Sequence, residues 1–392
     1  MLVQVARAAA IAVRRGHPWV YREGLVRPPK SLASGAAVEL TDETGAFLAH
    51  GLWDAASPIA VRVFERERRA RVDERTLAER LERAIGRRDA MFADDGNTTA
   101  YRLCNGEGDR LPGLVLDRYG DVAVVRLDGD ALRAWLDRLV PPLAAALARR
   151  GIRTVGLRAE RDERSPTRLK SLHGPDPPER IVVRERGVAM EVDLAHGQKT
   201  GAFLDQRENR ARVRALAAGR ARVLNLFSYA GGFSIAAALG GAGHVTSVDS
   251  AAAAHATAQR TLRLNGLDPG AHAFVTADAF DFLERARTRK ERFDLVVSDP
   301  PSFAPSERAR PRALAAYRRL HGAIAGVLAD GAVFCASSCS SHVHAEDFLA
   351  TLDDAALGPT DLRLLELRGQ PADHPTLPAW PEGRYLKFAV LG

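Results

Sequence analysis

The stretch ARVLNLFSYAGGFSIAAALGGAGHVTSVD, residues 221–249, decides the fold, because a strand, a glycine turn, a helix and a second strand follow one another in it. Its two ends, 221–227 and 244–249, are apolar runs of strand length, and the part between them has helical character. Strands that are apolar on both sides are typical of a parallel sheet covered by helices on both faces. The stretch therefore predicts an α/β unit.

The same alternation continues toward the C-terminus. Further strands are predicted at 273–278, 293–299 and 332–338, and helices begin near residues 250, 278 and 313. Alternating strands and helices are the sign of a doubly wound parallel sheet. We therefore expect residues 195–392 to form one Rossmann-like α/β domain.

Two smaller segments precede this domain. Residues 1–70 contain short strands, with a hairpin signal at Asp42–Gly45 between two apolar runs. Residues 74–190 indicate a small α+β unit that starts with an amphipathic helix. The apolar face of this helix is formed by Leu77, Leu81, Ala84 and Ile85.

Proline and glycine mark two expected breaks in the middle segment. Pro141 and Pro142 are expected to interrupt a second helix, because a proline removes a helix hydrogen bond. The segment LKSLHGPDPPER, residues 169–180, is rich in both residue types and is predicted to be a loop. Cys104 is interpreted as a small buried residue.

Composition limits the function classes. The chain is 46% hydrophobic and 27% charged, which is typical of a globular protein, and its net charge of +7 favours an anionic partner. No apolar run reaches the ~18 residues of a membrane helix, and the N-terminal apolar patch is a poor signal peptide, so we expect a cytoplasmic location. Three cysteines, unevenly placed, predict neither a disulfide framework nor a metal site.

Glycine and acidic residues gather where the predicted strands end, which is where doubly wound sheets bind ligands. Gly231 and Gly232 allow a ligand to approach the backbone closely after the first strand. Asp249 follows the second strand and suits two ribose hydroxyls. Asp278 follows the third and can accept from an exocyclic amine, and Asp299 follows the fourth.

These acids favour one class of cofactor. The turn SYAGGF, residues 228–233, lacks the G-x-G-x-x-G spacing that a dinucleotide pyrophosphate requires. Three acids repel a diphosphate but attract a cationic sulfonium ligand, so S-adenosylmethionine fits better. In the alternative reading, each acid caps the helix that follows it. This reading can explain any one of the three acids, but it is less suited to all three together. The expected cofactor site also includes Phe227, Ser228, Tyr229, Ser250 and Ala279.

Specific motifs extend over nearly the whole chain. They are RRGHPWVY (14–21), GQKTGAFLDQRENR (197–210), LNLFSYAGGFS (224–234), SDPPSF (298–303), SSCSSH (337–342) and PADHPTLPAWPEGRYLK (371–387). Together they resemble the PUA-domain-containing 23S ribosomal RNA methyltransferases that make 5-methylcytosine. The resemblance implies a PUA-like RNA-binding domain at 1–70, a central α+β domain at 74–190 and a class I methyltransferase domain at 195–392. It also implies ribosomal RNA as the partner and is compatible with a homodimer.

The resemblance further implies covalent catalysis by Cys339. Cytosine C5 is a weak nucleophile until a thiolate adds to C6; C5 then takes the methyl group, loses its proton, and the thiolate is expelled. Asp299 is expected to bind the N3/N4 edge of cytosine. Cys335, within an apolar run, is interpreted as buried, and the base that removes the C5 proton is unassigned.

The two prolines after Asp299 are expected to form a rigid lip beside the target base. Pro300 and Pro301 restrict the backbone and offer no N–H to compete for the ligand, and Phe303 is expected to wall the base. The same D-P-P turn occurs in methyltransferases that act on exocyclic amino groups without a thiol. An RNA guanine or adenine amino-group methyltransferase is therefore the alternative, and a non-enzymatic RNA-binding or assembly factor is a third reading.

Four further residues are expected to contact RNA, and three are expected to form a lid. Arginine can meet phosphate while an aromatic ring stacks on an unpaired base, which suits Arg14, Arg15 and Trp19. Lys199 can meet either a carboxylate or an RNA phosphate. Within the same motif as Lys199, a lid over the methionine end of the cofactor is expected from Asp205, Gln206 and Arg207, although these three can instead simply begin a helix.

Overall fold

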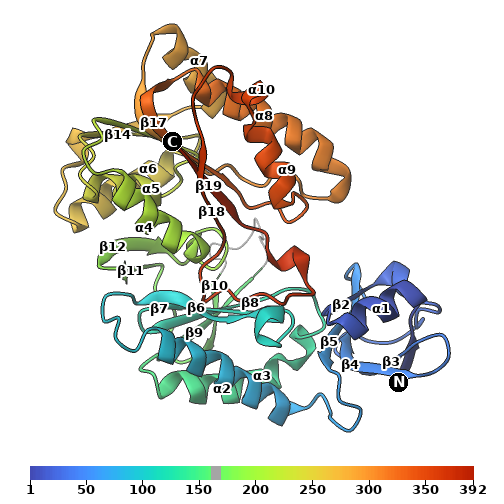
Figure 1. Cartoon of the computed structure of the whole chain (residues 1–392). Helices are drawn as coiled ribbons and strands as arrows, with labels where there is room; N and C mark the ends of the chain where they lie inside the picture. The colour runs from blue at the N-terminus through green and yellow to red at the C-terminus, as the bar shows by residue number, and fades with distance from the viewer. Residues whose placement is uncertain (160–168) are drawn as a thin grey trace. The chain divides into compact units, whose positions relative to one another are not determined.

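The computed structural model describes residues 1–159 and 169–392 (Figure 1). Its contacts divide the chain into two compact units. Unit 1 consists of Met1–Arg184, Val192–Leu204 and Ala372–Gly383, and unit 2 consists of Glu185–Glu191, Asp205–Pro371 and Arg384–Gly392. Two of the quoted motifs, at 197–210 and 371–387, are therefore shared between the units. Among the described residues, no helix is long and apolar enough to cross a membrane.

Unit 2 is built on a seven-stranded sheet of order β15-β14-β13-β16-β17-β19-β18. Strands β13 to β17 are parallel, whereas β19 runs antiparallel between β17 and β18. The predicted doubly wound sheet is thus confirmed, with an antiparallel addition at one edge. The strands are β13 (Arg222–Leu226), β14 (His244–Asp249), β15 (Ala273–Thr276), β16 (Phe293–Ser298), β17 (Leu328–Ser338), β18 (Leu364–Arg368) and β19 (Lys387–Leu391).

Helices cover both faces of this sheet, and the side chains of β16 show why. Val296 lies in a buried cluster with residues of α7 and α8, whereas Leu295 and Val297 lie in a second cluster with residues of α4, α5 and α6. Successive side chains of a strand point to opposite faces, so an apolar run fills both clusters. The helices are α4 (Arg207–Leu216), α5 (Gly232–Leu239), α6 (Ala252–Leu264), α7 (Ala279–Thr288), α8 (Arg310–Ala325), α9 (Ala345–Leu349) and α10 (Asp354–Leu357).

The N-terminal part of unit 1 is a five-stranded sheet with one helix. The predicted hairpin turn is present: Asp42 Oδ1 accepts from the N–H groups of Thr44 and Ala46 at 2.9 and 3.0 Å. The sheet order is β1-β3-β4-β5-β2. Its elements are β1 (Leu2–Gln4), α1 (Arg7–Arg15), β2 (Trp19–Tyr21), β3 (Ala37–Thr41), β4 (Phe47–Trp53) and β5 (Ile59–Glu65).

The rest of unit 1 is a second five-stranded sheet, of order β10-β9-β8-β7-β6, with two helices. The predicted face of α2 is buried against this sheet, with Leu81 and Ile85 completely inaccessible. The elements are α2 (Glu74–Met91), β6 (Ala100–Asn105), β7 (Leu114–Tyr119), β8 (Val122–Leu127), α3 (Leu136–Ala148), β9 (Thr154–Arg158) and β10 (Leu169–His173). A two-stranded sheet of β11 (Arg180–Glu185) and β12 (Val188–Asp193) follows.

Two expectations from proline and glycine were wrong. Helix α3 runs through Pro141 and Pro142 without interruption, because Leu139, Leu143 and Leu147 are fully buried and hold it against the sheet. The start of the expected loop at 169–180 is instead the edge strand β10, which pairs antiparallel with β9. A strand at the edge of a sheet needs a hydrogen-bonded partner on one side only. The prolines of this segment lie after β10 and therefore do not remove any of its hydrogen bonds.

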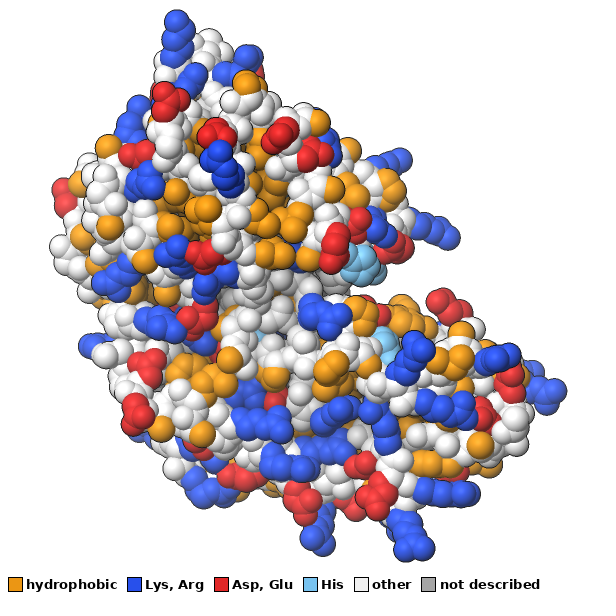
Figure 2. Space-filling model, in the orientation of Figure 1, with side chains coloured by type: hydrophobic (Ala, Val, Ile, Leu, Met, Phe, Trp, Pro, Cys, Tyr) orange, Lys and Arg blue, Asp and Glu red, His pale blue; other side chains and the backbone are white. Residues whose placement is uncertain are grey.

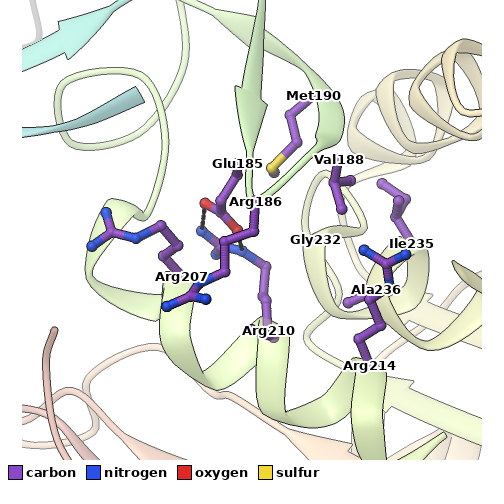
Figure 3. Close-up of a pocket in the computed structure, with 11 residues that line it drawn as sticks. Glu185, Arg186, Val188, Met190, Arg207, Arg210, Arg214, Gly232, Ile235 and Ala236 are labelled. Carbon is purple, nitrogen blue, oxygen red and sulfur yellow. Dashed lines mark hydrogen bonds and ion pairs between the residues drawn. The ribbon is translucent and has the colours of Figure 1, made fainter. Parts of the chain in front are cut away.

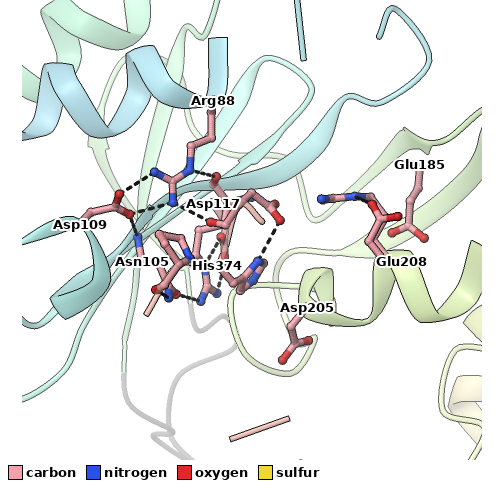
Figure 4. Close-up of polar contacts among 12 residues, drawn as sticks. Arg88, Asn105, Asp109, Asp117, Glu185, Asp205, Glu208 and His374 are labelled. Carbon is pink, nitrogen blue, oxygen red and sulfur yellow. Dashed lines mark hydrogen bonds and ion pairs between the residues drawn. The ribbon is translucent and has the colours of Figure 1, made fainter. Parts of the chain in front are cut away.

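Buried charges anchor the segment Ala372–Gly383 within unit 1 (Figure 4). Arg88 binds Asp109 through two hydrogen bonds of 2.7 and 2.8 Å and donates to the Asp373 carbonyl at 2.6 Å. Asp373 Oδ2 accepts from the Arg102 N–H at 3.0 Å, and the Arg102 guanidinium binds Asp117 at 2.8 and 3.0 Å. Buried charges are stable only when paired in this way. The aspartate of the D-H-P motif is therefore a structural anchor.

Candidate active site

The turn after β13 has an unusual backbone that Asp249 holds in place. Phe227 and Tyr229 have φ of 57° and 45°, which is rare for residues other than glycine. The Tyr229 N–H donates to Asp249 Oδ2 at 2.7 Å, and the Ser228 N–H donates to the Val248 carbonyl at 3.0 Å. The end of β14 thus fixes the shape of the turn that follows β13.

Glycine is required where this turn enters α5. Gly231 has a φ of 79°, and a Cβ there would lie 2.6 Å from the Cβ of Ala258. Helix α5 begins at Gly232, directly after this turn, so its first N–H groups have no partners within the helix. The arrangement provides hydrogen-bond donors at the carboxyl edge of the sheet.

The polar groups of this edge fit S-adenosylmethionine. Asp249 uses one lone pair of each oxygen, since Oδ1 accepts from the Ala251 N–H at 2.8 Å and Oδ2 from Tyr229. Each carboxylate oxygen can accept more than one bond, so capacity remains for ribose hydroxyls. Within the described residues, the Ser228 Oγ is buried without a hydrogen-bond partner. Ser250 follows Asp249 and is exposed.

Asp278 also caps a helix. Its Oδ1 accepts from the N–H groups of Phe280 and Asp281 at 2.8 and 3.3 Å, at the start of α7. The side chain is exposed, and Ala279, the first residue of α7, is buried. Helix capping therefore accounts for the Oδ1 atom of Asp278. A contact between Asp278 and the cofactor stays a prediction.

The three residues expected as a lid are buried at the start of α4, and Gln206 contacts the ends of β16 and β17. Gln206 Nε2 donates to Asp299 Oδ2 at 3.0 Å and to Ser337 Oγ at 3.1 Å. Asp205 Oδ2 accepts from the Tyr385 hydroxyl at 2.6 Å. Asp205, Gln206 and Arg207 are all at most 3% exposed. The contact between Gln206 and Asp299 joins the lid motif to the D-P-P turn.

The structure brings Cys339 and the turn after Asp299 together. Strands β16 and β17 are parallel neighbours, with Ser298 opposite Ala336, so the residues that follow them share one edge. Cys339 is partly exposed, and its Sγ lies 3.9 Å from the Pro300 carbonyl oxygen. Pro300 is the residue directly after Asp299. A base held by Asp299 would therefore lie beside a cysteine thiol.

The other two cysteines are unsuited to catalysis. Cys104 and Cys335 are both free and fully buried, as expected from the sequence. Burial raises the pKa of the Cys335 thiol to about 12, and it also raises the pKa of Cys104. Both thiols therefore remain protonated at neutral pH, and a protonated thiol is a poor nucleophile.

A set of polar groups that the sequence did not reveal supports the Cys339 turn. The Tyr317 hydroxyl donates to Ser338 Oγ at 2.9 Å. Lys387 Nζ donates to the carbonyls of Ser340 and Tyr385 at 2.6 and 2.8 Å. Tyr317 lies within α8, outside the quoted motifs. Lys387 ends the motif at 371–387, but nothing in that motif indicates its neighbour.

The remaining residues of the D-P-P-S-F turn differ in exposure. Pro300 is buried, whereas Pro301 and Ser302 are exposed. The Phe303 ring packs on Tyr317, with ring centroids 4.8 Å apart, and is partly buried. Pro301 is thus accessible to a substrate, and a contact between Phe303 and the base stays a prediction.

Comparison with known proteins agrees with this site. A family model for S-adenosylmethionine-dependent methyltransferases matches residues 124–384, and a model for PUA-like domains matches residues 3–66. The chain belongs to the S-adenosylmethionine-dependent methyltransferase family. The cofactor predicted from the acidic strand ends is therefore confirmed, as are the α/β fold and the PUA-like domain.

Relatives cover this methyltransferase almost from end to end. It is 38% identical over 400 residues to a ribosomal RNA large subunit methyltransferase of Deinococcus radiodurans, with 99% of this chain and 96% of that protein covered. It is 35% identical to ribosomal RNA large subunit methyltransferase I of Aeromonas salmonicida, with 100% and 99% covered. The crystal structure of SMU.776 complexed with SAH has a TM-score of 0.88 at 25% identity and covers 100% of this chain and 99% of that one.

A cavity of about 120 Å³ in unit 2 of the methyltransferase is a poor candidate for the cofactor site (Figure 3). It lies between α4, α5 and the turn that joins β11 and β12, and Arg210 at its wall pairs with Glu185 at 2.7 and 2.5 Å. Small-molecule sites usually need roughly 300 Å³ or more. Cationic walls also disfavour a sulfonium. Four arginines line the cavity: Arg186, Arg207, Arg210 and Arg214.

The residues expected to contact RNA differ in their exposure and in their contacts within unit 1. Arg15 is exposed, and the Arg14 side chain is 53% exposed, although it contacts Asp42. Trp19 already has contacts within unit 1, because its indole N–H donates to Glu107 at 2.7 Å and its ring packs edge-on against Trp380. Stacking of Trp19 on a base would require it to leave these contacts.

Lys199 is the last of the basic residues expected to contact RNA, and further basic side chains lie on the surface of unit 1. Lys199 has a φ of 51°, and its Nζ lies 4.6 Å from the centre of the Phe203 ring, so this lysine packs on its own motif. Figure 2 shows many other Lys and Arg side chains, with Asp and Glu side chains among them, over the part of unit 1 that contains β6 to β10. Together with the net charge of +7, these exposed cations favour contact with an anionic polymer.

Proposed function

We propose that this methyltransferase forms 5-methylcytosine in large-subunit ribosomal RNA, with Cys339 as the nucleophile. The observation that carries the proposal is the approach of the Cys339 Sγ to the Pro300 carbonyl, directly beside Asp299. An amino-group methyltransferase needs the D-P-P turn but has no use for a thiol there. The names of the relatives, which are ribosomal RNA large subunit methyltransferases, support the substrate.

The residues of this edge can supply the nucleophile and hold the target base. S-adenosylmethionine supplies an electrophilic methyl group when it is bound. The Cys339 thiolate forms a bond to cytosine C6, and the electrons of the C5–C6 double bond make C5 nucleophilic. Asp299 accepts from the N4 amino group and so holds the ring in register. Once C5 has taken the methyl group, which leaves S-adenosylhomocysteine, transfer of the C5 proton to a base restores the double bond and breaks the carbon–sulfur bond, which returns the thiolate.

The position of the methyl group on RNA tests this proposal. The purified protein is incubated with total RNA and isotopically labelled S-adenosylmethionine, and the digested nucleosides are identified by mass spectrometry. We expect the label in 5-methylcytidine from large-subunit RNA, because only a ring carbon requires the thiol. Label in a methylated exocyclic amino group of guanosine or adenosine would support the alternative reaction and contradict our proposal.

Arg14 and Arg15 are expected to contribute to RNA binding through phosphate contacts. Replacing both with glutamine should weaken RNA binding and reduce the slope of log affinity against log salt by about 1 to 1.5, since each phosphate contact to a single strand releases about 0.7 counterion. The slope is measured by fluorescence anisotropy between low and physiological salt. Arg292→Gln is the control, because Arg292 is exposed in unit 2. Equal slopes for the double variant and the wild type would exclude these two residues from the interface.

A further inference from the structure

Lys387 is a buried cation beside the proposed nucleophile. It is 4% exposed and begins β19, where it lies opposite Ser338 in the antiparallel pairing with β17. Its Nζ donates to the Ser340 carbonyl, so its contacts bracket Cys339 on both sides along the chain. Burying an ammonium costs free energy unless nearby groups compensate its charge. The two carbonyls it binds are neutral, which points to a negatively charged group nearby.

The charges around Cys339 indicate that the negatively charged group near Lys387 is the Cys339 thiolate. Tyr317 interacts electrostatically with both Cys339 and Asp299, so the three side chains lie close together. Burial raises the pKa of Tyr317, so its hydroxyl stays neutral, whereas the Asp299 carboxylate opposes a second negative charge. Burial lowers the pKa of Lys387 to about 8, and its attraction to the Cys339 thiolate acts in the opposite direction. Lys387 thus supplies a positive charge that can offset the charge of Asp299.

We propose that Lys387 is a positioning residue that stabilises the Cys339 thiolate against the charge of Asp299 and fixes the turn at residues 338–340. The inference rests on the proposed nucleophilic role of Cys339. Reactive cysteines generally need a nearby cation or helix N-terminus, because the thiolate and not the thiol attacks. A purely structural role predicts that loss of Lys387 changes stability and leaves the reactivity of the Cys339 thiol unchanged.

The reactivity of Cys339 in the full-length protein without RNA distinguishes the two roles. Alkylation by iodoacetamide is followed from pH 5.5 to 9 by mass spectrometry of the peptide that contains Cys339. Lys387→Gln keeps a donor for the Ser340 carbonyl but removes the charge, and Lys387→Arg keeps the charge. Lys290→Met is the control, since Lys290 is exposed in the same unit. Alkylation of the buried Cys335 reports any loss of folding.

We expect Lys387→Gln to slow alkylation of Cys339 at pH 7 about tenfold, which corresponds to a rise of one unit in the thiol pKa. At high pH the rates should converge, because the thiol is then ionised in both proteins. Lys387→Arg and the control should stay close to wild type. An unchanged pH profile for Lys387→Gln, with Cys335 still protected, would overturn the proposal. If Lys387→Gln exposes Cys335, the test depends on Lys387→Arg. A pH profile of Cys339 alkylation in Lys387→Arg that is shifted as far as the profile of Lys387→Gln would also overturn the proposal. Since no RNA is present, failure of the proposed cytosine chemistry is detected separately by nucleoside mapping.

Discussion

Replacing Cys339 with serine should lower methyl transfer to RNA by about 10⁴-fold or more while leaving cofactor affinity within about twofold of wild type. A serine hydroxyl is not ionised at neutral pH, so it cannot add to C6 at a useful rate. Cofactor binding should persist, because the groups that fit the nucleoside lie at the ends of β13 and β14. Transfer is measured with labelled S-adenosylmethionine, and cofactor binding by calorimetry.

Cys335→Ala is the matched control for this replacement. Cys335 lies on β17 only four residues before Cys339, but it is fully buried between the strands and helices. Its loss removes one sulfur from the core without touching the proposed site, so transfer should remain close to wild type. Full activity of Cys339→Ser would exclude covalent catalysis by this residue. Loss of both cofactor binding and transfer would instead indicate that the variant is misfolded.

Replacing Asp249 with asparagine should weaken S-adenosylmethionine binding about 100-fold. A charged acceptor that binds two hydroxyls contributes roughly 1.5–3 kcal/mol per hydrogen bond, and a loss of about 2.7 kcal/mol corresponds to two powers of ten in affinity. Asparagine keeps the size of the side chain and one oxygen that can accept from the Tyr229 N–H. The effect therefore reports the lost charge more than a collapsed turn.

Calorimetry with S-adenosylmethionine checks this expectation. Asp330→Asn is the control, because Asp330 is exposed on β17 away from the carboxyl edge. An affinity for Asp249→Asn within threefold of wild type would mean that the ribose is bound elsewhere. The cavity lined by arginines would then have to be reconsidered as part of the cofactor site.

The main features of the fold could be predicted from the sequence because buried parallel strands are apolar on both sides. Residues 293–298 are such a run, and their alternate side chains do fill two separate clusters. The antiparallel insertion of β19 could not be predicted, because its pairing with β17 joins residues about 50 positions apart without a local signal. Helix α3 was wrongly expected to be interrupted, because the burial of its leucines outweighs two prolines that locally disfavour a helix.

The candidate site was predicted in part, and the missing part depends on strand pairing. Asp249, Asp299 and Cys339 each follow a predicted strand, so parallel pairing brings them to one edge. Lys387 reaches this edge only through its register opposite Ser338. Trp19 illustrates a different limit: an aromatic residue among arginines resembles an RNA contact, but its packing against Trp380 depends on a segment more than 300 residues away.

Covalent capture of RNA tests the central claim most directly. RNA that contains 5-fluorocytidine carries a fluorine at C5 that cannot leave as a cation, so a thiolate bound at C6 cannot be expelled after methyl transfer. With such RNA and S-adenosylmethionine, we predict a protein–RNA complex that survives denaturation, with the nucleotide attached to the peptide that contains Cys339. The complex should be absent with Cys339→Ser. Methylation of unmodified RNA without any such complex on the fluorinated RNA would contradict the covalent mechanism.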